Sequence, residues 1–240
     1  MKYYIDFEAT QYTQQIMEIG CVDENGREFH GLIRHKKVGK FVEALTGLTP
    51  EKLMKAPEAD DTLKSFFKWV LESPDQSAAQ FYCYGDSDFG FVKNTKKRAY
   101  TQKSQMILDF IAGNIYDISS QVREYFGIVK NVALIKVANY FDASLTQDHN
   151  ALHDARLLKF ICEKMKEKPC EDDPFPEYKE KYVAYDRGVK VAEFYGIIPA
   201  TTWLIENQDM RGASFNNIQK RIINSAKNGQ SYCGFMWEIS

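Results

Sequence analysis

The sequence has little of several features that would assign it to a specialised class. Its 240 residues hold only five cysteines, with no C-x-x-C pair, so it predicts neither a disulfide framework nor a zinc site. No window approaches the roughly eighteen apolar residues of a membrane span, and the N-terminus lacks the pattern of a signal peptide. We therefore expect a protein of the reducing cytoplasm without a membrane span.

A strong excess of basic residues is also absent. The formal net charge of -2 excludes a uniformly basic surface, so nucleic-acid binding would need a local patch. One basic run could form such a patch, although a solvated helix face explains it equally well: Lys93, Lys96, Lys97, Arg98 and Lys103. A hydrophobic content of 44% and a charged content of 27% are ordinary for a soluble globular chain.

The N-terminal part of the chain predicts a mixed sheet with helices. Strand patterns over 2–7, 15–23 and 27–34, with the hairpin signal Asn25-Gly26 before the third, predict three antiparallel strands. After Pro50 the apolar residues no longer recur at every second position but about every 3.6 residues, which predicts helices. Helices are expected over 60–71, after Asp88, and over 118–126, 134–141 and 150–165, with a buried strand of the same sheet over 81–84. This order predicts an α/β domain over 1–168.

A change of composition separates a second unit. Three prolines and five acids between Lys168 and Glu180 predict an acidic linker over 169–183. Residues 184–240 would then form a small, mostly helical unit. Residues 181–240 hold seven Lys or Arg against five acids, which suits a nucleic-acid-positioning module. A packing appendage or a protein-docking surface is the competing interpretation.

Two acids near the N-terminus carry the first chemical signal. Asp6 and Glu8 in Y-I-D-F-E-A-T are separated by one residue, so a strand would project both carboxylates to one face and Ile5 and Phe7 to the other. Adjacent carboxylates repel each other, and a hard cation such as Mg²⁺ would relieve that repulsion. Taken alone, the pair is explained more simply by a strand end that reaches solvent.

A second segment strengthens the metal interpretation. In Q-D-H-N-A-L-H-D-A, His149 is placed at the entrance of a helix and Asp154 about one turn inside it, so an imidazole and an acid would lie near one another. His30 and His35 have no acid at a matching spacing and are interpreted as surface residues, whereas His153 should point to a different helix face from Asp154.

Three motifs in this order resemble those of the DEDDh 3′→5′ exonuclease superfamily, which includes RNase T, the proofreading subunit of the bacterial replicative polymerase and the ERI-type exonucleases. They are Y-I-D-F-E-A-T, G-D-S-D-F-G-F and H-N-A-L-H-D-A, and their form is most similar to the ERI-type branch. L-T-G-L-T-P-E-K-L-M-K-A-P also resembles a segment of many members. The resemblance covers roughly residues 1–165 and implies an RNase H-like fold.

The resemblance also implies roles for particular residues. Asp6, Glu8, Asp88 and Asp154 would hold two Mg²⁺ or Mn²⁺ ions, and His149 would be the general base. Asp88 is preferred to Asp86 because it matches the second acid of the middle motif, and Asp86 is then expected to cap a helix. Phe7, Ala9 and Thr10 match positions that line the terminal-nucleotide pocket in relatives, although core packing is an alternative for Phe7.

These observations predict a nuclease that removes nucleotides from the 3′ ends of single-stranded DNA or RNA, or from 3′ overhangs, and releases nucleoside 5′-monophosphates. Three alternatives stay open: a noncatalytic module that binds nucleic-acid ends, a proofreading factor that acts with a polymerase, and a phosphodiesterase that acts on small molecules or short oligonucleotides. The C-terminal unit weakly resembles the helix-turn-helix-like modules appended to some homing endonucleases and phage proteins.

Overall fold

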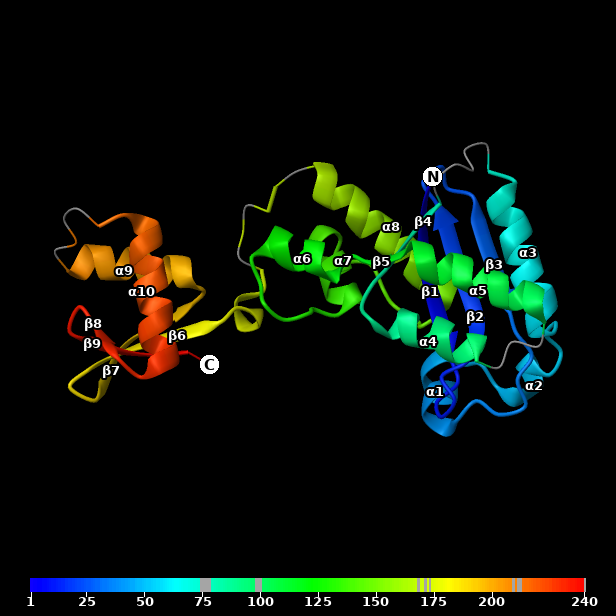
Figure 1. Ribbon diagram of the computed structural model, residues 1–240, viewed down its shortest axis with the longest axis horizontal. Helices are drawn as coiled ribbons and strands as arrows, with labels where there is room; N and C mark the ends of the chain where they lie inside the picture. Colours follow the sequence, from blue (N-terminus) through cyan, green and yellow to red (C-terminus); the bar gives the residue numbers. More distant parts are fainter. Residues whose placement is uncertain are drawn as a thin grey trace. The chain divides into compact units, whose positions relative to one another are not determined.

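A computed structural model describes residues 1–73, 79–97, 101–167, 169–170, 172, 174–208, 210 and 213–239. The chain divides into two compact units, one formed by residues 1–120 and 133–169 and the other by residues 121–132 and 170–240. Figure 1 shows the elements of both units in their chain order. No helix in the described part of the chain is both long enough and apolar enough to cross a membrane.

A five-stranded mixed sheet organises the first unit, with the strand order β3-β2-β1-β4-β5. The strands β1 (Lys2–Ala9), β2 (Ile16–Asp23) and β3 (Glu28–Leu32) pair antiparallel, whereas β4 (Gln80–Cys83) and β5 (Ile115–Asp117) extend the sheet in parallel from β1. The predicted antiparallel opening and the strand near 81–84 are confirmed. The short strand β5 was not predicted.

Helices cover both faces of this sheet. Apolar side chains of α3 (Ala59–Leu71) and α5 (Gln102–Asn114) join one face in a single core, which includes Ile5, Phe66 and Phe81. The helix α8 (Ala151–Glu167) packs on the opposite face against β1 and β2. The remaining helices of this unit are α1 (Lys40–Thr46), α2 (Pro50–Leu53), α4 (Ser87–Lys96) and α7 (Leu134–Phe141), while α6 (Ser119–Phe126) runs across the boundary between the units.

The second unit contains a sheet that the sequence analysis missed. Its strands are β6 (Lys181–Asp186), β7 (Val189–Tyr195), β8 (Ser231–Tyr232) and β9 (Phe235–Ile239), all antiparallel in the order β7-β6-β9-β8. The helices α9 (Ile197–Asn207) and α10 (Phe215–Asn228) pack on it around Trp237, and a short 3₁₀ turn, η1 (Pro176–Tyr178), precedes it. A helix was expected over residues 214–226, where α10 lies. The other expected helix, over residues 191–198, was wrong because most of that stretch forms β7, and the expected mostly helical unit therefore also contains a four-stranded sheet.

The boundary segment also differs in detail from the sequence-based expectation. Strand β6 begins at Lys181, within the stretch 169–183 that the sequence analysis assigned to a linker. Three residues of the Lys168–Glu180 stretch, Lys168, Glu171 and Asp173, lie outside the described residues, as does Arg98 of the basic run.

Candidate active site

The end of β1 presents two carboxylates on the face of the sheet that α8 covers. Ile5 and Phe7 lie in the apolar core on the opposite face, and strand alternation therefore turns Asp6 and Glu8 toward α8. Both acids are partly exposed, in contrast to the fully buried Ile5. The local sequence alone thus fixes the orientation of the pair.

A close approach of α8 to β2 brings the third acid to this pair. A Cβ atom on Gly20 would lie 2.0 Å from the Ala151 carbonyl carbon, so only glycine permits the backbone of α8 to lie this close to the strand. Asp154, in the first turn of α8, is 3% exposed. The glycine in E-I-G-C-V is therefore part of the reason that the N-terminal and C-terminal motifs meet.

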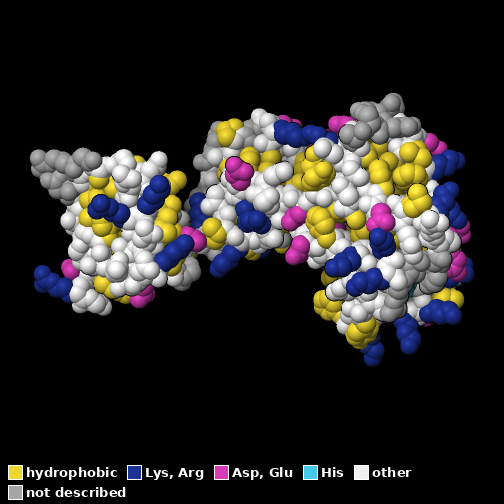
Figure 2. Space-filling view, viewed as in Figure 1, with side chains coloured by type: hydrophobic (Ala, Val, Ile, Leu, Met, Phe, Trp, Pro, Cys, Tyr) yellow, Lys and Arg dark blue, Asp and Glu magenta, His cyan; other side chains and the backbone are white. Residues whose placement is uncertain are grey.

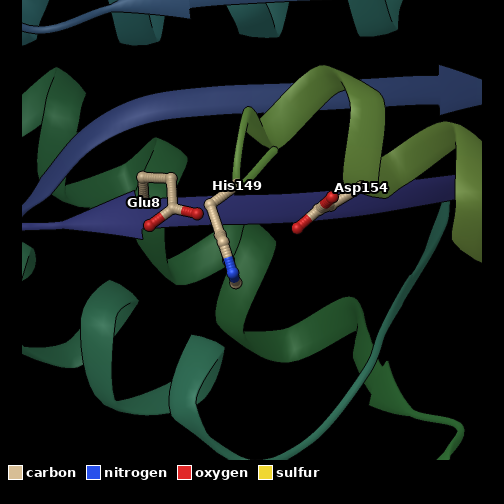
Figure 3. Close-up of side chains that lie close together, drawn as sticks. All are labelled: Glu8, His149 and Asp154. Carbon is tan, nitrogen blue, oxygen red and sulfur yellow. The ribbon is translucent and has the colours of Figure 1, made fainter. Parts of the chain in front are cut away.

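Figure 3 shows that Glu8, His149 and Asp154 converge from β1 and from the start of α8. One ligand atom from each of these three residues lies within 4.8 Å of the other two. His149 has φ of 53°, a left-handed conformation that costs about 1–2 kcal/mol for a residue with a side chain. Because this strain sits at the junction of loop and helix, the fold holds the imidazole beside the acids at a cost to stability.

The helix α4 supplies the fourth predicted acid. Asp88 lies in its first turn and is 4% exposed. Hydrogen bonding from the Phe7 backbone and Cys83 acts to lower the pKa of its carboxyl, against burial. Asp86 occupies the N-cap position, but its side chain makes no capping hydrogen bond. The expected capping interaction of Asp86 was therefore wrong, although its position before the helix was predicted.

The carboxylates interact strongly in the absence of a cation. Burial, followed by repulsion from neighbouring acids, raises the pKa of Asp6 well above its ordinary value and that of Glu8 to about 8. Burial also raises the pKa of Asp88 to about 8, with Asp117 adding to the effect. Burial raises the pKa of Asp154 above its ordinary value. The hydrogen bond from Gln147 and the nearby His149 and His153 act in the opposite direction and lower it. Such a concentration of acids with raised pKa values is typical of functional sites.

One carboxylate oxygen gives a direct test of whether this site suits a cation. Asp154 Oδ2 accepts a 2.6 Å hydrogen bond from Gln147 Nε2, whereas the buried Asp154 Oδ1 has no hydrogen-bond partner among the described residues. A buried acceptor without a partner costs about 1–3 kcal/mol, and a divalent cation would satisfy it. The oxygen-rich donor set is the one that Mg²⁺ and Mn²⁺ prefer, so the residues fit the expected metal.

A second group of possible ligands overlaps the first. Single ligand atoms of Asp148, His153 and Asp154 also lie within 4.8 Å of one another. His153 Nδ1 lies 2.8 Å from Asp148 Oδ1, and this pair is partly exposed to solvent. Their mutual hydrogen bond already accounts for Asp148 and His153, so the Glu8–His149–Asp154 group is the better candidate.

Glu18 is a part of the site that the sequence analysis missed. It is 1% exposed on β2 and accepts hydrogen bonds from His30 Nε2 at 2.6 Å, Asn150 Nδ2 at 2.9 Å and the Ala151 backbone at 3.3 Å. Its partners show that Glu18 holds the start of α8 against the sheet. A single acid inside the otherwise apolar strand Q-I-M-E-I-G-C-V is the only sequence signal for it.

Two histidines interpreted as simple surface residues have specific partners. His30 donates to the buried Glu18, which raises the His30 pKa, although burial acts in the opposite direction. His35 Nε2 donates to the Ile16 carbonyl at 3.0 Å, and burial lowers the His35 pKa. Sequence spacing could not reveal these partners because neighbouring strands, rather than helical turns, supply them.

The expected substrate-pocket residues are packed within the fold. Phe7 is 3% exposed in the core below the sheet, so it offers no open ring face for stacking, which favours the alternative that its side chain is core. Ala9 is 6% and Thr10 is 4% exposed. The Thr10 hydroxyl lies 2.6 Å from Thr13 Oγ1 and accepts from the Gln15 backbone, so it stabilises the turn that follows β1.

Two lysines of the basic run, at the end of α4 and directly after it, have polar partners close by. Lys96 forms an ion pair with Asp109, and Lys97 Nζ donates to Asn94 Oδ1 at 3.3 Å. These contacts favour the interpretation of the run as a solvated helix face.

Comparisons with known proteins point in the same direction as this geometry. The family model RNase_T, described as "Exonuclease", matches residues 4–161. A DNA polymerase III of the PolC type from Bacillus cereus is 26% identical over 131 residues, which are 55% of this chain but 8% of that protein. The chain therefore spans only a small part of this relative.

Solved structures share the fold. The nuclease domain of 3′hExo, described as a DEDDh family member bound to rAMP, has a TM-score of 0.57 with 18% identity over 71% of this chain and 93% of that one. Pop2p of S. pombe, in a form described as bound to Mg²⁺ and Mn²⁺, has a TM-score of 0.50 with 12% identity over 72% of this chain and 84% of that one.

Proposed function

Because this chain belongs to the DEDDh exonuclease superfamily, we propose that it hydrolyses single-stranded nucleic acid from the 3′ end and releases nucleoside 5′-monophosphates. The observation that carries the proposal is the convergence of Glu8, His149 and Asp154, with a buried carboxylate oxygen left unsatisfied. The proposed substrates include duplexes with a 3′ overhang, since such an overhang also ends in a single strand.

Asp6, Glu8, Asp88 and Asp154 are the residues that would hold two divalent ions, Mg²⁺ or Mn²⁺. When bound, such ions neutralise negative charge on the scissile phosphate and acidify water. The protein contributes four acids on three rigid elements, β1, α4 and α8, so their positions are set before substrate arrives. The Mg²⁺ and Mn²⁺ bound to Pop2p support this choice of cofactor.

His149 is the proposed general base. Its imidazole lies beside Glu8 and Asp154, where it can accept a proton from the attacking water. Its left-handed backbone supports this role, because residues in strained conformations cluster at functional sites. Gln147 and Glu18 act indirectly, the first by holding Asp154 and the second by holding the start of α8.

The proposed polarity and product rest on similarity. The related domain of 3′hExo was solved with rAMP, a nucleoside monophosphate, which is the kind of product expected here. Phe7 is buried, so we assign the backbone at the end of β1, at Ala9 and Thr10, to contact with the terminal nucleotide.

The direct test is incubation with 5′-labelled single-stranded RNA and DNA in Mg²⁺, with EDTA as the control. A 3′→5′ exonuclease gives a ladder that shortens in single-nucleotide steps, and EDTA abolishes it. Metal-dependent release of the labelled mononucleotide without labelled intermediates would show the opposite polarity. Binding of 3′ ends without any cleavage would support the alternative of a noncatalytic module.

Proofreading is a second candidate, because the matched relative from Bacillus cereus is a polymerase. Under this alternative the same site removes a mismatched primer end for a polymerase partner. The two candidates differ in one measurement. In the presence of the polymerase, a proofreading factor degrades a primer with a mismatched 3′ end much faster than a primer with a paired end. An autonomous enzyme degrades free single strands without any polymerase.

A further inference from the structure

The outer stripe of α10 in the second unit combines exposed amide and basic side chains. Helical spacing places Ile218, Ile222 and Ser225 against the core, so the opposite side faces solvent. Five exposed residues share that opposite side: Asn216, Asn217, Lys220, Asn224 and Lys227. We refer to these five residues as the α10 stripe.

The charge of this helix is unusual for a simple solvated surface. Exposed helices ordinarily mix Glu with Lys, because such pairs stabilise a helix at i, i+4 spacing. The 14 residues of α10 include Lys220, Arg221 and Lys227 but no Asp or Glu. Within the described part of the chain, no carboxylate forms an ion pair with these three cations, although Arg221 lies 5.7 Å from the centre of the Tyr232 ring. Figure 2 shows several Lys and Arg side chains on the visible face of this unit.

The asparagines have a separate consequence for stability. Asn is among the less favourable residues inside a helix, at roughly 0.6 kcal/mol relative to Ala. Asn224 lies in the middle of α10 and is exposed, so no core packing offsets that cost. An external ligand that hydrogen-bonds to an exposed amide would offset it.

We propose that the α10 stripe binds double-stranded DNA by entering the major groove. An α-helix about 10–12 Å across fits the major groove of B-DNA, about 12 Å wide. Asn and Lys are suited to adenine and guanine edges respectively, and Lys also contacts phosphates. The stripe from Asn216 to Lys227 extends about 16 Å along the helix, enough for roughly five base pairs. The deep, narrow major groove of A-form RNA would not admit such a helix.

This surface is distinct from the nuclease site, which lies wholly in the other unit. A chain with both functions would hold the duplex part of a substrate through α10 while the nuclease site acts on a single-stranded end. The binding proposal does not require that the chain cleaves nucleic acid.

The test measures binding by the full-length protein in EDTA, so that cleavage cannot occur. Fluorescence anisotropy with a labelled 20-base-pair blunt DNA duplex gives the affinity and its salt dependence. We expect the double variant Lys220→Ala, Lys227→Ala to bind at least tenfold more weakly and to reduce the slope of log K against log salt by about 2. Asn224→Ala should weaken binding without a change in slope. Alanine favours helix, so α10 should remain folded.

The matched control is Lys181→Ala, Lys190→Ala, which removes the same charge from β6 and β7, where both lysines pair with Glu193. We expect this control to bind within twofold of the unmodified protein. An equal loss of DNA affinity in both double variants, or no loss of affinity in either, would overturn the assignment of DNA binding to α10. Equal affinity for a 20-base-pair RNA duplex, or equal competition by polyglutamate, would overturn the assignment to DNA. Nuclease activity, measured separately on a short single strand in Mg²⁺, tests the proposed function and leaves this result unaffected.

Discussion

Glu8 and Glu18 lie directly opposite each other on the antiparallel strands β1 and β2. Both side chains therefore project from the same face of the sheet, and Glu18 contributes, after burial, most to the raised pKa of Glu8. One acid of the pair faces the candidate metal site, while the other is tied to the start of α8. The pair thus joins the chemistry of the site to the structural element that completes it.

Removing the Glu18 side chain should destabilise the protein. Glu18→Ala leaves His30, Asn150 and the buried Ala151 backbone without their acceptor, which should cost roughly 2–3 kcal/mol. Urea unfolding of the metal-free protein measures this loss. The control is Glu28→Ala, which breaks the exposed ion pair with Arg156 and should cost less than about 1 kcal/mol. Equal losses would contradict the account of Glu18.

The pKa of Glu8 predicts how stability without metal depends on pH. Its folded value of about 8 lies above the ordinary 4.5, so the folded state holds the proton more tightly than the unfolded chain. The resulting stabilisation is complete below about pH 4.5 and is lost as the pH rises through about 8. Metal-free protein should therefore melt at a lower temperature at pH 8.5 than at pH 6.

Glu8→Gln tests this explanation because it removes the titrating group. At pH 8.5 and in EDTA the variant should be more stable than the unmodified protein by about 1 kcal/mol or more, since one pKa unit corresponds to about 1.4 kcal/mol. The stability of this variant should also decline less steeply as the pH rises. Thermal melts measure both effects, with Glu72→Gln, an exposed acid on the surface, as the control. A less stable Glu8→Gln protein would argue against repulsion at the site.

Gly20→Ala should separate α8 from the sheet. The added methyl group would meet the backbone of Ala151 and Leu152 at about 2 Å, and backbone cannot move aside as a flexible side chain can. We expect a loss of about 2–3 kcal/mol in stability and a large loss of nuclease activity. Gly113→Ala is the matched control because open space surrounds that position in α5. Normal activity in Gly20→Ala would show that the close approach is not needed.

Asp86 and Asp88 should respond differently to alanine. Asp88→Ala removes a proposed metal ligand and should abolish cleavage. Its stability should change little, because the loss of a buried charge that neighbouring acids repel offsets the loss of its hydrogen bonds. Asp86→Ala should change stability by less than about 0.5 kcal/mol, because no capping hydrogen bond is lost. Activity assays and unfolding of both variants decide between them. Loss of activity only in Asp86→Ala would identify Asp86 as the ligand.

The sequence predicted those parts of the site that have a local pattern. The D-x-E spacing on β1 places Asp6 and Glu8 on one face whatever the rest of the chain does. His149 lies just before α8 and Asp154 lies in its first turn, so their closeness is also local. Glu18 has no such pattern, because its partners His30 and Asn150 are supplied by a neighbouring strand and a distant loop.

The same distinction applies to the fold. Long apolar periods predicted α3, α7 and α8, whereas the three-residue strand β5 is too short to carry a period. In the second unit, β6 and β7 pair through the Arg187-Gly188 turn, but the acidic stretch before them concealed the start of the sheet. The missing capping bond of Asp86 depends on side-chain geometry, which residue type alone does not determine.

The most direct test of the central claim is the cleavage rate of Asp154→Asn on a single-stranded substrate in Mg²⁺. Asn keeps the shape of Asp154 but removes the charge of the buried oxygen that has no partner. The account predicts a fall in kcat of at least ~10³, because an ion that the reaction requires is no longer held. The control Asp109→Asn, an exposed acid on α5, should retain full activity. A turnover of Asp154→Asn close to that of the unmodified protein would contradict the account.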